Sequence, residues 1–278
     1  MGMRRSASIP ARINIIGEHT DYLDGLALPF SCEARLVLRA SASESTSGDP
    51  TIVALWEEAN GWPATLEVES TIPIGAGMSS SAALCLAVVL CAQGEMKPMK
   101  ACLEAQRIEH KILNTPCGLL DQMAMMFSKK DCACLIDFSS PSVKTVELPK
   151  DWLFKLIDSG VRRELSETSF GSSRSDAELQ KHAHDENQRV LEALHAKPPQ
   201  LGLLLNASHQ GLVDLGVSHP KVDAHVERLQ STPGVLGARM MGGGFGGMIL
   251  VLVEGAHVLP ETALVRSSEG GFLEELLE

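Results

Sequence analysis

The sequence has few basic residues for its length. It contains 24 lysines and arginines against 35 aspartates and glutamates, which gives a formal net charge of −11 at neutral pH. Binding to a nucleic-acid backbone requires a basic stripe, and the sequence has none. We therefore expect no nucleic-acid partner. A small anionic ligand stays compatible with this charge, because backbone N–H groups and a metal ion are able to hold it.

Long apolar segments and paired cysteine motifs are also missing. The longest uninterrupted apolar run, residues 82–92, is well short of the roughly 20 residues that a membrane-spanning helix needs. We therefore expect no membrane segment, and no secretory signal is visible. The seven cysteines include no CxxC spacing. This pattern favours free thiols over a disulfide framework or a zinc site, and it predicts a cytoplasmic protein.

The length of the chain favours two domains. Its 278 residues, 44% of them hydrophobic, are enough for a large core that is divided in this way. Pro149 separates two β-type runs within residues 143–156. We place the domain boundary there, which predicts a first domain of residues 1–150 and a second domain of residues 151–278.

Residues 72–92, IPIGAGMSSSAALCLAVVLCA, change character halfway. Gly75 and Gly77 predict a flexible turn, three serines follow, and the apolar run after them suits a buried helix. The free N–H groups at a helix N-terminus carry the positive end of the helix dipole, and with serine hydroxyls they make a phosphate site. One serine is enough to cap a helix, so this pattern favours anion binding over simple capping. No Gly-Lys-Ser/Thr follows the glycines, which excludes a Walker A loop.

A second glycine cluster, GARMMGGGFGGMILVLV, covers residues 237–253. Its formal GxGxxG is followed by a β-type run, whereas a dinucleotide fingerprint must be followed by a helix. The pattern therefore predicts strand, glycine turn and strand. A plain hairpin is one interpretation. We favour ligand-related packing, because five glycines in six residues leave a backbone that another group can approach closely.

Residues 101–127 predict two consecutive helices. The first helix ends at Asn114, and the second begins near Cys117, with Thr115 as its cap and Pro116 at its first position.

Two carboxylates, Glu109 and Asp121, lie on these two predicted helices. The ordinary interpretation makes Glu109 a surface residue and Asp121 a complement to the helix dipole. The alternative is a pair of functional carboxylates.

Residues 11–25, ARINIIGEHTDYLDG, begin like a buried strand and then become polar. The ordinary interpretation is a solvated turn after Gly17, which is what loops of this composition most often form. The alternative is a binding site, because the carboxylates of Glu18 and Asp21 and the imidazole of His19 match the hydrogen bonds that a sugar's hydroxyls require.

These segments together resemble the GHMP small-molecule kinases, and among them the galactokinases. Residues 73–83 are similar to the family loop Pro-x-Gly-x-Gly-Leu-Ser-Ser-Ser-Ala-Ala, with Met78 in the place of leucine. Residues 12–22 resemble the galactokinase signature Arg-Val-Asn-Leu-Ile-Gly-Glu-His-Thr-Asp-Tyr. Residues 237–248 resemble the third motif Gly-Ser-Arg-Met-Thr-Gly-Gly-Gly-Phe-Gly-Gly-Cys, and the order AQRIEH…PCGLLDQ is similar to Ala-Glu-His followed by Pro-Cys-Gly-Ile-Met-Asp-Gln.

The resemblance implies a fold and an activity. The fold is mixed α/β with two domains, the first with a topology like ribosomal protein S5 and the second ferredoxin-like, and with the active site in the cleft between them. The activity is the ATP- and Mg²⁺-dependent phosphorylation of the anomeric hydroxyl of galactose or a related hexose. A non-catalytic sugar and nucleotide sensor, and a kinase for galacturonate or N-acetylgalactosamine, are the alternatives. We expect a monomer or weak oligomer.

The resemblance also implies a role for individual residues. Asp121 is the catalytic aspartate, and Arg12 supplies a cation to the transferring group. Glu18, His19 and Asp21 bind the sugar, as does Phe170, which stands where galactokinases usually have tyrosine and predicts a more permissive pocket. The remaining expected contacts are with ATP, at Gly75, Gly77, Ser79, Ser80, Ser81, Gly243 and Gly244, and with Mg²⁺, at Ser81 and Glu109. Two histidines, His209 and His219, lack ligand spacing and are expected to be solvated or capping residues.

Overall fold

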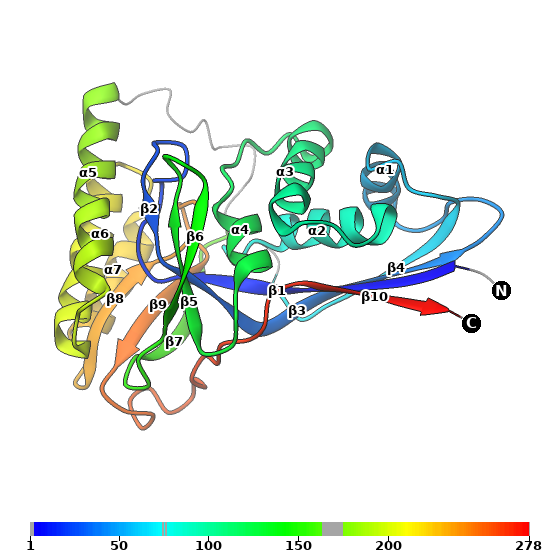
Figure 1. The fold of residues 1–278 in the computed structure, drawn as a ribbon. Coiled ribbons are helices and arrows are strands. Elements are labelled where there is room, and N and C mark those ends of the chain that lie inside the picture. The colour runs from blue at the N-terminus through cyan, green and yellow to red at the C-terminus, as the bar shows by residue number, and fades with distance from the viewer. Residues whose placement is uncertain (1–2, 74, 76, 163–174, 278) are drawn as a thin grey trace.

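The computed structural model describes residues 3–73, 75, 77–162 and 175–277. Its largest sheet is antiparallel, with the strand order β10-β1-β3-β4. These strands are β1 (Met3–Asn14), β3 (Pro29–Ala42), β4 (Ala64–Ser70) and β10 (Phe272–Leu277). The last strand returns to pair with the first, so both ends of the described chain lie at one end of this sheet (Figure 1).

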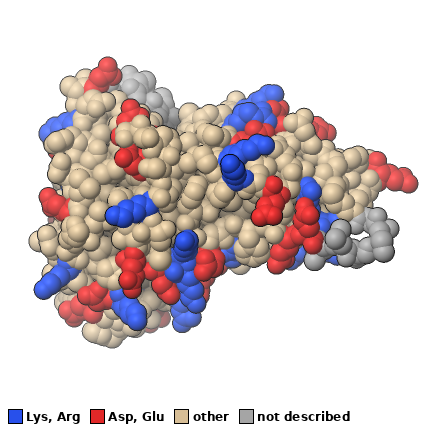
Figure 2. All heavy atoms as spheres, viewed as in Figure 1, with Lys and Arg blue, Asp and Glu red and all other residues tan. Residues whose placement is uncertain are grey.

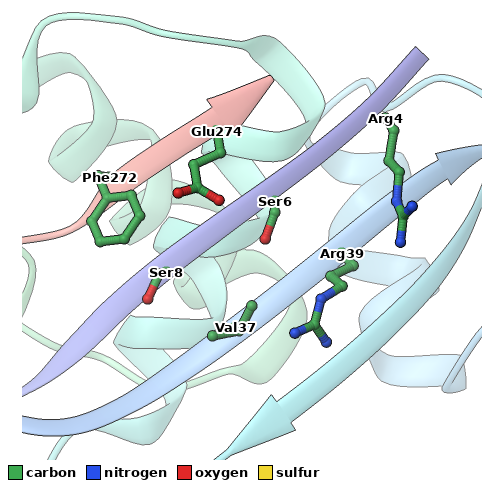
Figure 3. A pocket seen from close by; sticks show the side chains of 7 residues that line it. All are labelled: Arg4, Ser6, Ser8, Val37, Arg39, Phe272 and Glu274. Carbon is green, nitrogen blue, oxygen red and sulfur yellow. The ribbon is translucent and has the colours of Figure 1, made fainter. Parts of the chain in front are cut away.

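Helices cover one face of this sheet (Figure 1). They are α1 (Pro50–Glu58), α2 (Ser80–Gln93), α3 (Pro98–Ile108) and α4 (Leu120–Phe127). The alternation of strand residues explains this arrangement, because Leu36 and Leu38 are buried against the helices while Val37 points away from them. The opposite face carries a shallow hollow of about 330 Å³ whose lining includes Ser6, Ser8, Arg39 and Glu274 (Figure 3).

A small sheet joins the two halves of the molecule. It has the order β2-β5-β6 and consists of β2 (Leu26–Ala27), β5 (Cys132–Asp137) and β6 (Ser142–Glu147).

The second half has a three-stranded sheet of order β7-β9-β8, formed by β7 (Leu153–Asp158), β8 (Val235–Met240) and β9 (Met248–Val253). Helices α6 (Pro198–Asp214) and α7 (Pro220–Gln230) pack on this sheet, and α5 (Asp176–Ala193) packs against α6 and β2. Strand β9 faces two cores: Ile249 and Val251 pack among the residues of α6 and α7, and Leu250 belongs to the core of the first sheet.

The mixed α/β class expected from the sequence is confirmed. The predicted strand, glycine turn and strand in residues 237–253 is also confirmed, because β8 and β9 pair as an antiparallel hairpin. The division after Lys150 stays a prediction. The strand β10 belongs to the first sheet although it lies within the predicted second domain.

The predicted end of the first helix at Asn114 is confirmed, since Asn114 caps the helical segment, but the predicted start of the second helix near Cys117 is wrong. Helix α3 ends at Ile108, a π-helical turn (Glu109–Leu113) follows, and α4 begins only at Leu120. Tertiary contacts explain the late start. The backbone N–H of Cys117 donates to His110 Nε2 at 3.1 Å, and Gly118 packs so tightly on Asp21 that a Cβ there would lie 1.9 Å from a carboxylate oxygen.

In the part of the chain that the structure describes, no single helix has the length and apolarity to cross a membrane, although the bent pair Ser80–Gln93 and Pro98–Leu113 meets both criteria together. On the face shown in Figure 2, basic side chains are scattered and stand near acidic ones.

Candidate active site

An ion pair between Arg12 and Asp121 lies where three of the sequence motifs meet. Arg12 Nε donates to Asp121 Oδ1 at 2.7 Å, and Arg12 Nη1 donates to the carbonyl oxygen of Gly77 at 2.5 Å. The hydroxyl of Ser79 donates to the other oxygen of Asp121. The structure thus joins the strand of the signature segment, the glycine-serine loop and the first turn of α4.

Local backbone geometry directs Arg12 toward this meeting point. The pairing of β1 with β3 shifts register between Pro10 and Arg12, as in a β-bulge. Bulges re-aim the side chain beside them and are frequent next to active sites. The side chain of Arg12 is buried, and burial by itself would lower its pKa. The carboxylates of Asp121 and Glu18 outweigh burial and raise the pKa of Arg12, so this residue is a permanent cation.

The glycine-serine loop adopts a backbone that favours glycine. Gly75 and Gly77 have φ values of +67° and +71°. Ser79, the N-cap of α2, is left-handed at φ +62° and makes no side-chain cap bond to the helix. Its hydroxyl donates a hydrogen bond to the carboxylate of Asp121 instead. Simple capping, the ordinary interpretation for this serine, is therefore wrong, while anion binding by Ser80, Ser81 and the glycines stays a prediction.

The third motif packs against the chain itself. A Cβ at Gly242 would lie 3.0 Å from the carbonyl oxygen of Gly77, and one at Gly244 would lie 2.2 Å from that of Val217. Both glycines have φ values near +90°. The glycines of this β8–β9 hairpin allow close approach of the protein's own backbone, and the predicted packing against a ligand stays a prediction. The roles of Gly243 and Gly244 toward ATP stay predictions.

Glu109 is buried, so its interpretation as a surface residue is wrong. It lies in the π-helical turn and accepts a hydrogen bond from Gln122 Nε2 at 2.9 Å. Burial and the negative charge of Asp121 together raise the pKa of Glu109 to about 7, against the opposing effect of a hydrogen bond with Ser81.

The carboxylates of Glu109 and Asp121 repel each other, and a bound cation nearby would relieve that repulsion. Among the described residues, no group of three or more histidine, cysteine, aspartate or glutamate side chains is arranged to hold a metal ion. Mg²⁺ does not need such a group, since it is usually bound by one or two carboxylates with water and substrate phosphates. The oxygen donors of Ser81 and Glu109 therefore fit Mg²⁺.

The carboxylate of Glu18 is held by the third motif. It is buried, accepts a hydrogen bond from the backbone N–H of Gly242 at 2.6 Å, and forms an ion pair with Arg239 Nη2 at 3.0 Å. Burial alone would raise its pKa, but the charges of Arg239 and Arg12 lower the pKa of Glu18 to about 2. This residue is not part of a solvated turn.

Asp21 and His19 lie beside Glu18. Burial raises the pKa of Asp21 to about 6, with a further contribution from the charge of Asp121. His19 is left-handed at φ +58°, and its Nδ1 lies 3.0 Å from the hydroxyl of Tyr22. The structure thus brings Glu18, His19 and Asp21 together next to Asp121. Phe170, the fourth residue expected at the sugar, lies outside the described residues.

The sequence-based reasoning missed several residues of this region. Arg239 is fully buried, donates to the carbonyl oxygens of Asn14 and Ile15, and forms an ion pair with Glu18. An arginine within a β-type run beside a glycine cluster was the available signal. Glu186 and Gln122 were missed because the sequence around each is typical of an ordinary helix.

One of the two histidine expectations is wrong. His209 is buried, and burial lowers its pKa to about 4. His219 caps α7 as expected, since its Nδ1 accepts from the backbone N–H of Lys221 at 3.1 Å.

Three family models match the chain. The galactokinase galactose-binding signature matches residues 5–42, the GHMP kinases N terminal domain matches residues 49–129, and the GHMP kinases C terminal model matches residues 177–259.

The chain is similar to known proteins over most of its length. It is 33% identical to the galactokinase of Thermotoga maritima over 87% of each chain, and 29% identical to that of Thermosipho africanus over 97% of this chain and 91% of the relative. The structure of Lactococcus lactis galactokinase complexed with galactose matches 97% of this chain and 95% of its own, with a TM-score of 0.80 at 24% identity. Methanococcus jannaschii mevalonate kinase matches with a TM-score of 0.66 at 14% identity, over 97% of this chain and 96% of its own. The expected GHMP kinase fold is thereby confirmed, and the chain belongs to the galactokinase family of GHMP kinases.

Proposed function

We propose that the protein transfers the γ-phosphoryl group of ATP to the anomeric hydroxyl of galactose. The single observation that carries this proposal is the ion pair of buried Arg12 with half-buried Asp121, at the junction of the signature strand, the glycine-serine loop and α4. Family membership supports ATP as the donor. The galactose-binding signature, which contains Glu18, His19 and Asp21, supports galactose as the acceptor.

The geometry supports the following roles in the transfer. The sugar hydroxyl attacks the γ-phosphorus, the bond from that phosphorus to the β,γ-bridging oxygen of ATP breaks, and ADP leaves. The proton of the hydroxyl passes to Asp121, whose carboxylate is already oriented by Arg12 and Ser79. Arg12, a permanent cation, stabilises the negative charge on the transferring group.

Ser81 and Glu109 would hold Mg²⁺, which supplies charge neutralisation to the phosphates when it is bound. The first turn of α2, with Ser80 and Ser81, would present backbone N–H groups to those phosphates.

The sugar side of the site is acidic. Glu18 stays ionised because Arg239 and Gly242 hold its carboxylate, and it is a fixed acceptor for sugar hydroxyls. Asp21 is an acceptor when it is ionised.

We infer that the protein acts on small molecules in the cytoplasm as a monomer or weak oligomer, and light scattering after size exclusion tests the oligomeric state.

An ADP-release assay with a panel of sugars tests the proposal. We expect the highest kcat/KM with galactose, a lower value with N-acetylgalactosamine and galacturonate, and the lowest with glucose. Phosphorus NMR should place the phosphate on the anomeric oxygen. Binding of galactose and ATP without any product would contradict the enzyme and support a sensor, and a higher kcat/KM with galacturonate or N-acetylgalactosamine would reassign the substrate.

A further inference from the structure

We propose that helix α5 of the second half positions the sugar-binding loop, with Glu186 as the principal positioning residue. The loop comprises residues 17–26 and carries Glu18, His19 and Asp21, so this inference rests on the proposed function. In Figure 1, α5 stands beside β2, the strand in which the loop ends.

Glu186 connects α5 directly to the start of the loop. Its side chain has no solvent exposure, and Oε2 accepts a hydrogen bond from the backbone N–H of Gly17 at 3.0 Å. A buried carboxylate is costly unless it is paired and hydrogen-bonded. Arg189 Nη1 donates to its Oε1 at 2.6 Å, and Ser208 Oγ donates to its Oε2 at 3.0 Å. The carboxylate is therefore held in one orientation before it meets the loop.

Two more side chains of α5 hold the same loop. Asn187 Oδ1 accepts from the backbone N–H of Leu26 at 2.7 Å, at the end of the loop. His182 Nε2 lies 2.9 Å from the carbonyl oxygen of Glu18. His182 and Glu186 are four residues apart and share one face of the helix, next to Asn187. The loop is thus held at its beginning, at a sugar-binding residue and at its end.

The loop depends on these contacts because its own backbone is unusual. Gly17 has φ +94°, and a Cβ there would lie 2.3 Å from the carbonyl oxygen of Leu26. His19 is a non-glycine residue in the left-handed region, at φ +58°. Such conformations persist only where the surroundings enforce them. Inside the loop, the hydroxyl of Thr20 lies within hydrogen-bond distance of the carbonyl oxygens of Gly17 and Leu26. This interaction links the two ends of the loop but does not connect the loop to a helix.

The bonds from α5 end at Gly17, Glu18 and Leu26, and the glycine-serine loop is contacted by Arg12 and Asp121 instead. The inference therefore predicts that α5 controls the affinity for the sugar and leaves the affinity for ATP unchanged.

The variants Glu186→Ala and Asn187→Ala test this separation. The first leaves the buried N–H of Gly17 and the second the half-buried N–H of Leu26 without its acceptor, and we expect the galactose KM and Kd to rise about tenfold or more. The KM for ATP should stay within about twofold. Asn187→Asp keeps the accepting Oδ1 and should recover most of the galactose affinity. Leu205→Ala on α6 is the stability control, since it opens a cavity in the core but removes none of the loop bonds.

Hydrogen exchange of backbone amides in residues 15–27 gives a readout that needs no substrate. We expect faster exchange there in Glu186→Ala and Asn187→Ala, and wild-type exchange in Asn187→Asp. The inference is overturned if amide exchange in this segment is unchanged in Glu186→Ala and Asn187→Ala, or if the KM values for galactose and ATP rise together in these variants. It is also overturned if Leu205→Ala raises the galactose KM as much as they do. Failure of the proposed function has a different signature, the absence of galactose phosphorylation by the wild-type protein.

Discussion

The substitution Asp121→Asn tests the centre of the site. It keeps the volume of the side chain and replaces one carboxylate oxygen by an amide nitrogen. Both oxygens are in use, one by Arg12 Nε and the other by the Ser79 hydroxyl. The variant loses the negative charge and one acceptor, but Arg12 keeps its bond to Gly77 and the nearby charge of Glu18. We therefore expect a folded protein with an impaired transfer step.

The expected loss is large for kcat and small for binding. A positioned group that transfers a proton contributes about 10²–10⁴-fold to rate. This range corresponds to about 2.7–5.4 kcal/mol, at about 1.36 kcal/mol for each factor of ten. The Kd for ATP should change by less than about threefold, because the phosphate-binding backbone of the glycine-serine loop is left in place.

The same substitution has a second effect through Asp21. Burial is the main reason that the pKa of Asp21 is raised to about 6, and the charge of Asp121 adds to it. If the ionised form binds the sugar, the galactose Kd of the wild type should rise about tenfold between pH 7 and pH 5, since a single proton competes with the ligand below its pKa. Glu18, whose pKa is about 2, stays ionised over this range. Removing the charge of Asp121 lowers the pKa of Asp21, so the rise in the variant should be smaller.

Single-turnover measurements of phosphoryl transfer give the chemical step, and titration calorimetry at pH 5, 6 and 7 gives the galactose Kd. Thermal unfolding checks that the variant is folded. A turnover within about tenfold of the wild type would remove Asp121 from the catalytic role. An identical pH dependence of the galactose Kd in both proteins would refute the electrostatic coupling of the two aspartates.

Three further predictions concern the metal, the sugar loop and the specificity. Ser81→Ala and Glu109→Ala should each raise the Mg²⁺ concentration for half-maximal rate, and unchanged metal dependence in both would contradict the ligand assignment. Gly118→Ala places a Cβ 1.9 Å from the Asp21 carboxylate and should raise the galactose KM about fivefold or more, with the ATP KM as the control; an unchanged galactose KM would show that Asp21 does not bind the sugar. Phe170→Tyr should raise kcat/KM for galactose about two- to tenfold and narrow the sugar panel, and no change for any sugar would refute the pocket prediction.

Local patterns in the sequence were sufficient for several features. The glycine run before MILVLV predicted the hairpin of β8 and β9, because the periodicity and the missing helix are local properties. Asp121 was expected to complement the dipole of a helix, and it does lie at a helix N-terminus, in the first turn of α4. The start of that helix was predicted wrongly. Cys117 is held by His110 and Gly118 packs on Asp21, and such contacts override local capping signals.

The long-range contacts of the site are decided by the tertiary structure alone. Arg12 meets Asp121 across 109 residues because a register shift in β1 re-aims it, and Gly242 meets Glu18 across 224 residues because the third motif folds back onto the signature segment. No periodicity predicts these partners.

The acidic residues show most clearly what the sequence determines and what only the folded structure determines. The sequence establishes that Glu18, Asp21 and Glu109 are carboxylic acids with similar ordinary pKa values. Only the folded structure separates them, to about 2 for Glu18, about 6 for Asp21 and about 7 for Glu109. The physical reason is that burial raises each pKa, while the guanidinium groups of Arg239 and Arg12 reverse that effect for Glu18 alone among the three.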